Sequence, residues 1–227
     1  MIVLNCDRRR FLRAAAGASG LVLLAGLFPP LAAAGEIWGG SPFPFDSRNS
    51  LLREGLLVRL GRCDGCGRCV EACREANTIS GSGSRIVVYR RQDGAGAGYL
   101  PVMCSQCERP PCVDVCPTKA SMRDSSGRVV IDRKLCIGCY ACLMACPYNA
   151  RYFNAELRAM DACDFCADYR KRSGRREPAC VARCPRAALS YGSLDDPGFA
   201  GLVESMGRNV LRPDRGTDPR VFYAPAG

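Results

Sequence analysis

The chain has 227 residues, a net charge of +10, 17 cysteines and no histidine, and it is long enough for one large domain or two small ones. Without histidine it has no Ser-His-Asp or Cys-His nucleophilic site, no HExxH zinc site, no Rieske centre and no Cys-x-x-Cys-His haem attachment site. Its chemistry must therefore depend on thiols. The net positive charge, taken alone, is also compatible with binding to the phosphates of a nucleic acid.

Residues 1–34 have the layout of an export signal. The segment Asp7-Arg8-Arg9-Arg10-Phe11-Leu12-Arg13 resembles the twin-arginine motif, an apolar run follows at 14–28, and Ala32-Ala33-Ala34 is typical of a cleavage site. The apolar run is shorter than the roughly 20 residues that a spanning helix needs, which disfavours an uncleaved anchor. Because the twin-arginine route exports folded proteins, the sequence predicts a periplasmic protein that acquires its cofactors before export.

Residues 35–55 are predicted to be a linker. This stretch contains glycine, proline and aromatic residues without a helical or alternating period, and it is compatible with disorder or with docking onto a partner. The run at 56–60 is expected to be a short strand. The folded part is predicted to cover residues 56–192.

Sixteen of the cysteines fall into four groups of four. The third group, Cys136-x2-Cys139-x2-Cys142-x3-Cys146-Pro147, has the spacing of a bacterial ferredoxin segment that binds iron–sulfur clusters. The first group repeats this spacing with Arg74 in place of the proline, whereas the second and fourth have longer middle gaps. The predicted ligands of these three groups are Cys63, Cys66, Cys69 and Cys73; Cys104, Cys107, Cys112 and Cys116; and Cys163, Cys166, Cys180 and Cys184.

Two alternatives compete for these cysteines. An exported cysteine-rich chain often forms disulfides, and the fourth group alone could bind a structural zinc ion. However, a disulfide framework needs no repeated short spacing that ends in Cys-Pro, and the fourth group ends in the same Cys-x3-Cys-Pro as the second and third. Four [4Fe-4S] clusters are therefore the favoured interpretation.

The positive charge fits this interpretation. Removing residues 1–34, which hold four arginines and one aspartate, leaves 28 basic and 21 acidic residues. If each oxidised cluster with its four thiolates carries a charge of about −2, four clusters contribute about −8 and nearly neutralise the excess. Most arginines are therefore expected to be counter-charges, and nucleic acid is not expected as a partner.

Local patterns predict the elements around the cysteines. Pro117, Pro147 and Pro185 each follow a cysteine and precede an alanine by three residues, which suggests a helical turn against each cluster, and Cys146 is expected to open a helix. Hairpins are expected between 85–90 and 99–102 and between 122–123 and 128–131. After the fourth cysteine group, a strand is predicted at 189–191. The C-terminal region, 193–227, is predicted to begin with a helix at 197–206 that Asp195 or Asp196 caps. The tail at 211–227 is expected to be extended, either disordered or lying over a neighbouring subunit.

The ligands are expected to cross over between groups. In two-cluster ferredoxins each group supplies three ligands to one cluster and its fourth to the other. The second and third groups are joined by a short hairpin and should form one pair, which leaves the first and fourth groups as the other. The predicted ligand sets are Cys104, Cys107, Cys112 and Cys146; Cys136, Cys139, Cys142 and Cys116; Cys63, Cys66, Cys69 and Cys184; and Cys163, Cys166, Cys180 and Cys73.

The predicted fold class is α+β. We expect two ferredoxin-like lobes of the bacterial dicluster type, related by a pseudo-twofold repeat, in which β-hairpins and short helices surround four iron–sulfur clusters. The first and fourth groups would form one lobe, and the second and third groups the other.

The four groups, with Cys136-Ile137-Gly138-Cys139 and Gly216-Thr217-Asp218-Pro219-Arg220-Val221-Phe222-Tyr223, resemble a known family. The chain is similar to the electron-transfer iron–sulfur subunits of the dimethyl sulfoxide reductase family, especially the exported type found with tetrathionate and polysulfide reductases and in nitrite reduction by cytochrome c systems. The resemblance covers about residues 56–224 and does not specify the substrate. One departure is Ser105-Gln106, where relatives often have a polar pair with histidine, and this change is expected to shift a cluster potential.

The resemblance implies a non-catalytic subunit with four [4Fe-4S] clusters in a periplasmic reductase complex. It would transfer electrons between two partner subunits. An integral membrane, quinone-handling subunit would lie beside the lobe of groups two and three. A molybdopterin catalytic subunit would lie beside the lobe of groups one and four. After signal cleavage the chain is expected to have no membrane span. The alternatives are an electron-transfer subunit of a cytochrome c nitrite reductase or hydrogenase complex, and a free-standing polyferredoxin carrier; an iron–sulfur regulator is disfavoured by the export signal.

Overall fold

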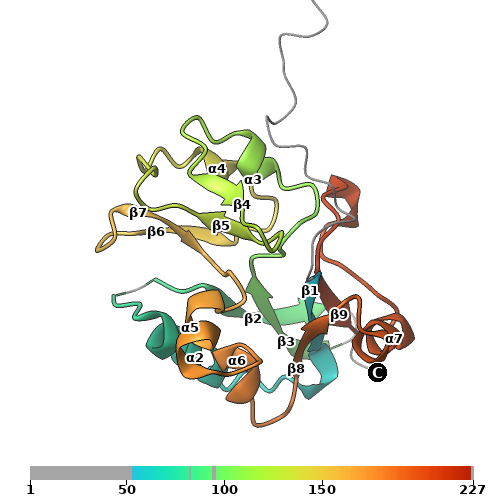
Figure 1. The fold of residues 1–227 in the computed structure, drawn as a ribbon. Coiled ribbons are helices and arrows are strands. Elements are labelled where there is room, and N and C mark those ends of the chain that lie inside the picture. The colour runs from blue at the N-terminus through green and yellow to red at the C-terminus, as the bar shows by residue number, and fades with distance from the viewer. Residues whose placement is uncertain (1–52, 82, 94–95, 226–227) are drawn as a thin grey trace, which may run out of the picture. The chain divides into compact units, whose positions relative to one another are not determined.

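The computed structural model describes residues 53–81, 83–93 and 96–225 (Figure 1). The predicted export signal at 1–34 and nearly all of the predicted linker at 35–55 lie outside these residues. None of the helices in the described part of the chain combines the length and the apolar composition that a membrane span requires.

A three-stranded sheet joins the two ends of the described chain. Its central strand, β1 (Glu54–Arg59), runs antiparallel to β8 (Leu189–Ser193) and parallel to β9 (Val221–Ala224). Leu56 and Val58 face the main core, whereas Leu57 faces the opposite side, where α7 (Pro197–Ser205) packs. A strand buried on both faces needs a continuous apolar run, which is why this segment lacks an alternating pattern. The strand predicted at 56–60 is thus confirmed with an earlier start and end.

Three antiparallel hairpins complete the β-structure. The two hairpins that the sequence predicts are confirmed, and a third one between the last two cysteine groups was not predicted. Their strands are β2 (Ile86–Asp93) with β3 (Gly96–Met103), β4 (Ser121–Arg123) with β5 (Val129–Ile131), and β6 (Arg151–Asn154) with β7 (Ala159–Ala162).

Short helices accompany every cysteine group. They are α2 (Arg68–Asn77), α3 (Pro111–Asp114), α4 (Ala141–Met144), α5 (Ala167–Ser173) and α6 (Ala179–Ala182), with single 3-10 turns η3 (Leu60–Arg62) and η4 (Pro213–Arg215). The predicted C-terminal helix is confirmed as α7, and Asp196 caps it by accepting a hydrogen bond from the Phe199 N–H.

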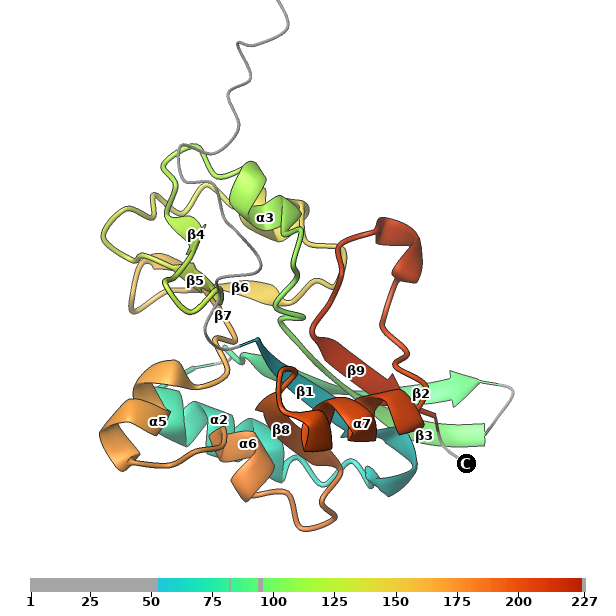
Figure 2. The same cartoon turned by 45° about the vertical axis from the view of Figure 1, so that its right-hand side comes forward.

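The helices and hairpins form two groups, shown in two orientations in Figures 1 and 2. We call α2, α5, α6 and the three-stranded sheet lobe 1–4, because it carries cysteine groups one and four. We call α3, α4 and the hairpins β4–β5 and β6–β7 lobe 2–3. Helices α2 and α6 contact each other in the first lobe, as α3 and α4 do in the second. The fold class is α+β.

The turn after each Cys-Pro differs from the prediction. Cys146 does not open a helix: α4 ends at Met144, and the residues after Cys146 form a turn. Lys119, Asn149 and Ala187, each two residues after the proline, have φ angles of +58°, +49° and +46°. This left-handed residue stops a helix from continuing, and the turn bends back over the cysteine.

The C-terminal tail also differs from the prediction. It is extended, but Val221–Ala224 forms strand β9 inside this chain, and Arg220 and Phe222 are each 2% exposed. Arg109 N–H donates to the Thr217 carbonyl and Glu108 N–H donates to the Asp218 carbonyl, so the segment before β9 is also held by its own chain. Residues 217–224 are therefore held by this chain itself, and contact between the exposed residues 212–216 and a neighbouring subunit stays a prediction.

Candidate metal centres

The structure gathers the sixteen described cysteines into four sets, each made of three cysteines from one group and one from another. Set 1 lines a single cavity, as does set 3. In set 2 the charges of neighbouring thiols of the set help to raise the pKa of Cys104, Cys107 and Cys112, and in set 4 they help to raise the pKa of Cys163 and Cys180. The sets are Cys63, Cys66, Cys69 and Cys184 (set 1); Cys104, Cys107, Cys112 and Cys146 (set 2); Cys116, Cys136, Cys139 and Cys142 (set 3); and Cys73, Cys163, Cys166 and Cys180 (set 4). These are the sets that the crossover rule predicts, and metal binding by them stays a prediction.

Every group begins with the same backbone turn. The residue before the second cysteine has a positive φ in each: Gly65 at +74°, Gln106 at +47°, Gly138 at +67° and Phe165 at +56°. At Gly65 a Cβ would lie 2.3 Å from the Tyr99 ring, so only glycine fits there. Gln106 and Phe165 are both fully buried, and packing holds these non-glycine residues in a conformation that L-residues rarely adopt.

The turn after Cys-Pro directs backbone N–H groups at the fourth cysteine. Ser121 N–H donates to Cys116 Sγ and Ala188 N–H donates to Cys184 Sγ, each at 3.3 Å. A side chain larger than Ala188, which is 2% exposed, would have little room there. Hydrogen bonds of this kind to cysteine sulfur stabilise the thiolate and help to set the potential of an iron–sulfur cluster.

Burial raises the pKa of eight of these sixteen thiols, so that they hold their protons when no metal is bound. Burial raises the pKa of Cys69 and Cys107 to about 11 and that of Cys73 and Cys104 to about 12. At Cys116 burial acts in the same direction, but the N–H of Ser121 and neighbouring donors outweigh it and lower the pKa. Metal ligation needs the thiolate, so loading of the buried sets must release protons.

The geometry of the sets suits a group larger than one ion. All sixteen described cysteines are free thiols, and within the described ranges no three histidine, cysteine, aspartate or glutamate side chains come close enough to chelate a single metal ion. Thiols around one zinc ion would have sulfurs about 3.8 Å apart, as follows from tetrahedral Zn–S bonds of about 2.3 Å. A cubane cluster is wider and is held by four thiolates spread around it.

A buried polar network borders set 4. Asn77 Nδ2 lies 3.6 Å from both Cys73 Sγ and Cys166 Sγ, and its Oδ1 accepts a hydrogen bond from Arg85. Arg85 also forms ion pairs with Asp161 at 3.0 Å and Asp164 at 2.9 Å, and its side chain is 6% exposed. The two aspartates offset the charge of Arg85, so this network positions Asn77 against the thiols without adding net positive charge.

Gln106 joins set 2 to set 4. Its Nε2 lies 3.8 Å from Cys104 Sγ of set 2 and donates to the carbonyl of Cys163, a set 4 residue, at 2.7 Å. Its Oε1 accepts from Val129 N–H at 2.7 Å. Because Gln106 is fully buried, its hydrogen bonds form a buried polar contact between the two lobes.

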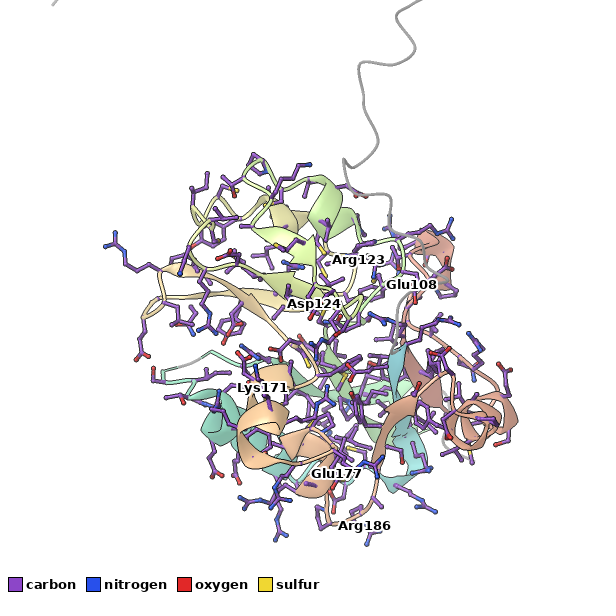
Figure 3. All side chains as sticks on the ribbon, in the orientation of Figure 1. Glu108, Arg123, Asp124, Lys171, Glu177 and Arg186 are labelled. Atoms are coloured by element: carbon purple, nitrogen blue, oxygen red, sulfur yellow. The ribbon has the colours of Figure 1, made fainter. Side chains whose placement is uncertain are left out.

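The C-terminal segment holds the loop of set 2. Arg220 Nε donates to the Gln106 carbonyl at 2.8 Å, and its Nη2 donates to the Gly127 carbonyl at 2.7 Å. Glu108 lies between Arg220 and Arg123, 3.7 Å from each, and Figure 3 shows Glu108 beside Arg123. Arg123 in turn donates to the Cys107 carbonyl at 2.7 Å. The loop that carries two set 2 thiols is thus held by two arginines.

Comparisons with known proteins agree with this geometry. Family models described as 4Fe-4S dicluster domains match residues 62–121 and 96–194. The chain is 42% identical to the B subunit of polysulfide reductase from Wolinella succinogenes over 179 residues, which cover 75% of this chain and 93% of the relative. The chain belongs to the family of iron–sulfur electron-transfer subunits of the dimethyl sulfoxide reductase type.

Two further relatives match most of the described chain. The chain is 36% identical to protein NrfC of Escherichia coli K12, with 77% of this chain and 81% of the relative covered. It is 43% identical to the thiosulfate reductase electron transfer subunit PhsB of Salmonella typhi, with 60% of this chain and 73% of the relative covered. The name of the second relative describes an electron-transfer subunit of a reductase.

The sequence predicted the thiols of this family but not the polar residues around them. Asn77, Arg85 and Arg151 gave no separate signal, because a polar residue in a short element is normally expected to face solvent. Gln106 stands out in the sequence only as a departure from relatives, and Arg220 only as part of the C-terminal motif.

Proposed function

We propose that this chain is the electron-transfer subunit of a periplasmic reductase complex and that it carries four [4Fe-4S] clusters, one in each cysteine set. The observation that carries the proposal is the convergence of sixteen free thiols into four sets. In each set three cysteines come from one group and the fourth comes from another, as in a dicluster ferredoxin. When bound, the clusters supply one-electron redox chemistry. The chain contributes thiolates, burial and hydrogen bonds to sulfur, which together set each potential.

The proposed electron path runs through the sets in the order 1, 4, 2, 3. Three contacts support this order. Cys69 of set 1 lies near Cys180 of set 4, Gln106 links set 4 to set 2, and Cys112 of set 2 lies near Cys142 of set 3. Sets 1 and 3 therefore stand at the two ends, each with one exposed cysteine, Cys66 and Cys139.

Iron analysis of anaerobically purified protein tests the proposal. Four clusters require sixteen iron and sixteen sulfide per chain, and reduction should produce electron paramagnetic resonance signals of [4Fe-4S] type. The variant Cys146→Ser tests the crossover: it should perturb the cluster of set 2 and spare that of set 3, although Cys146 belongs to the third group. A colourless protein, or one that contains only zinc, would contradict the proposal, and loss of the set 3 signal would contradict the crossover.

Each end of the path is proposed to meet a different partner. Ile137 and Met144, which are 67% and 83% exposed, lie with exposed Tyr140 around the loop of set 3, and this apolar surface fits an integral membrane, quinone-handling subunit. At the other end, exposed Arg62, Asp64 and Arg186 surround set 1, a charged surface that fits the molybdopterin catalytic subunit. This assignment of the two ends follows the family resemblance, and export by the twin-arginine route belongs to the same proposal.

Charge substitutions at the apolar end should separate the partners. Met144→Glu together with Ile137→Glu is expected to weaken binding to the membrane subunit at least tenfold, because both charges would have to be desolvated at the interface. The measurement is co-purification from detergent-solubilised membranes, with iron content as the check on folding. The matched control is Arg172→Glu with Lys171→Glu on exposed α5, which should leave this interaction intact; equal losses in both variants would rule out the assignment.

A further inference from the structure

Arg151 lies between the thiols of set 2 and those of set 3. It is the first residue of β6, directly after the turn that follows Cys146 and Pro147, and it is 4% exposed. Its Nη2 donates to Cys112 Sγ of set 2 at 3.0 Å, and the guanidinium lies close enough to Cys142 of set 3 to interact with its charge. The guanidinium therefore lies beside ligands of both sets in this lobe.

The charge of Arg151 has no carboxylate partner among the described residues. Two of its nitrogens, Nε and Nη1, are fully buried and have no hydrogen-bond partner. Burial opposes the charged form, but the nearby Cys112, Cys104 and Cys142 thiolates outweigh this effect and raise the pKa of Arg151. A buried cation with unused donors is costly unless an anion lies beside it.

Arg85 shows how this fold treats a buried arginine that serves a structural role. Arg85 is buried to a similar extent beside set 4, but Asp161 and Asp164 pair with it and Asn77 accepts another of its hydrogen bonds. Its donors and its charge are used within the polypeptide. Of these two arginines, only Arg151 keeps unpaired N–H donors and an uncompensated positive charge that could interact with a bound group.

We propose that Arg151 is the shared counter-charge of the clusters in sets 2 and 3, and that its free N–H groups donate to their inorganic sulfides. Reduction adds one electron to a cluster and makes it more negative, so a fixed cation nearby favours the reduced state of both. The guanidinium stays protonated throughout, so it moves no proton in this step. Arg151 is thus a positioning and tuning residue that raises both potentials together. This inference rests on the proposed function.

The test is a redox titration of the purified, cluster-loaded protein, monitored by electron paramagnetic resonance. Arg151→Gln removes the charge and keeps a donor, whereas Arg151→Lys keeps the charge. Arg151→Gln should lower the reduction equilibrium constants of two clusters at least tenfold each, equivalent to about 59 mV for one electron. Arg151→Lys should stay closer to wild type than Arg151→Gln for both clusters. Signals are assigned to sets 2 and 3 by their loss or change in Cys112→Ser and Cys142→Ser.

Arg208→Gln is the matched control. Arg208 lies after α7 and forms an exposed ion pair with Glu204, and the hydrophobic cluster around α7 contains no cysteine. Arg208→Gln removes the same charge as Arg151→Gln and should shift no cluster potential. The inference is overturned if Arg151→Gln shifts neither potential or only one, or if Arg208→Gln shifts them equally. If Arg151→Gln loses the iron of both sets, retention of iron in Arg151→Lys supports the role of charge, and equal loss in Arg151→Lys overturns it. Wild-type protein without iron would instead contradict the proposed function itself.

Discussion

Replacing Arg220 with methionine is expected to destabilise the protein by roughly 2–4 kcal/mol and to release the cluster of set 2 before the others. Arg220 is 2% exposed, and its guanidinium is the donor that reaches the Gln106 carbonyl from the C-terminal segment. Methionine fills part of the volume but leaves that buried carbonyl without its donor, whereas the Gly127 carbonyl keeps a hydrogen bond from Arg123. The loss is a large fraction of the roughly 5–15 kcal/mol that stabilises typical domains.

The measurement is anaerobic thermal unfolding, combined with iron content after brief exposure to a chelator. Arg212→Met is the matched control, because Arg212 is 47% exposed and its only ion-pair partner among the described residues is exposed Asp214. Exposed pairs contribute about 0–1 kcal/mol, so the control should unfold close to wild type. If the two variants lost equal stability, Arg220 would not hold the set 2 loop as described. Deletion of residues 217–227 should have a still larger effect, because it also removes β9 from the sheet.

Replacing Gln106 with leucine is expected to cost roughly 2–6 kcal/mol and to loosen the contact between the lobes. The change leaves the Val129 N–H and the Cys163 carbonyl without their Gln106 partners in a fully buried site. Leucine at this position must also keep the left-handed φ of +47°. Since Gln106 links sets 2 and 4, electron transfer between the lobes should slow as well.

Amide hydrogen exchange separates the local effect from global unfolding. Exchange should rise first at Val129 and in the set 4 loop that contains Cys163. Gln92→Leu, on an exposed position of β2, is the control and should change neither stability nor exchange at Val129. Unchanged protection of Val129 in Gln106→Leu would show that the amide does not join the lobes.

The elements that the sequence predicted correctly are those fixed by neighbours in the chain. The hairpin β4–β5 has the turn residues Asp124-Ser125-Ser126-Gly127 between its strands, and α7 has Asp196 and Pro197 at its start. The hairpin β6–β7 was missed because its strands do not alternate between apolar and polar residues. Arg151 and Asp161 lie in these strands and are each 4% exposed, so two charged residues stand where an apolar pattern was required.

By itself, the sequence determined the number and spacing of the thiols and the absence of histidine chemistry. These two features predict iron–sulfur ligation, because the spacing of ligands within a loop depends only on the local chain. Tertiary structure alone decided which polar groups reach those thiols. Arg151 meets Cys112 across 39 residues and Arg220 meets Gln106 across 114, and no local pattern encodes such pairs. The physical reason is that a buried polar side chain is stabilised by partners that folding brings to it, so its role exists only once the distant segments are packed together.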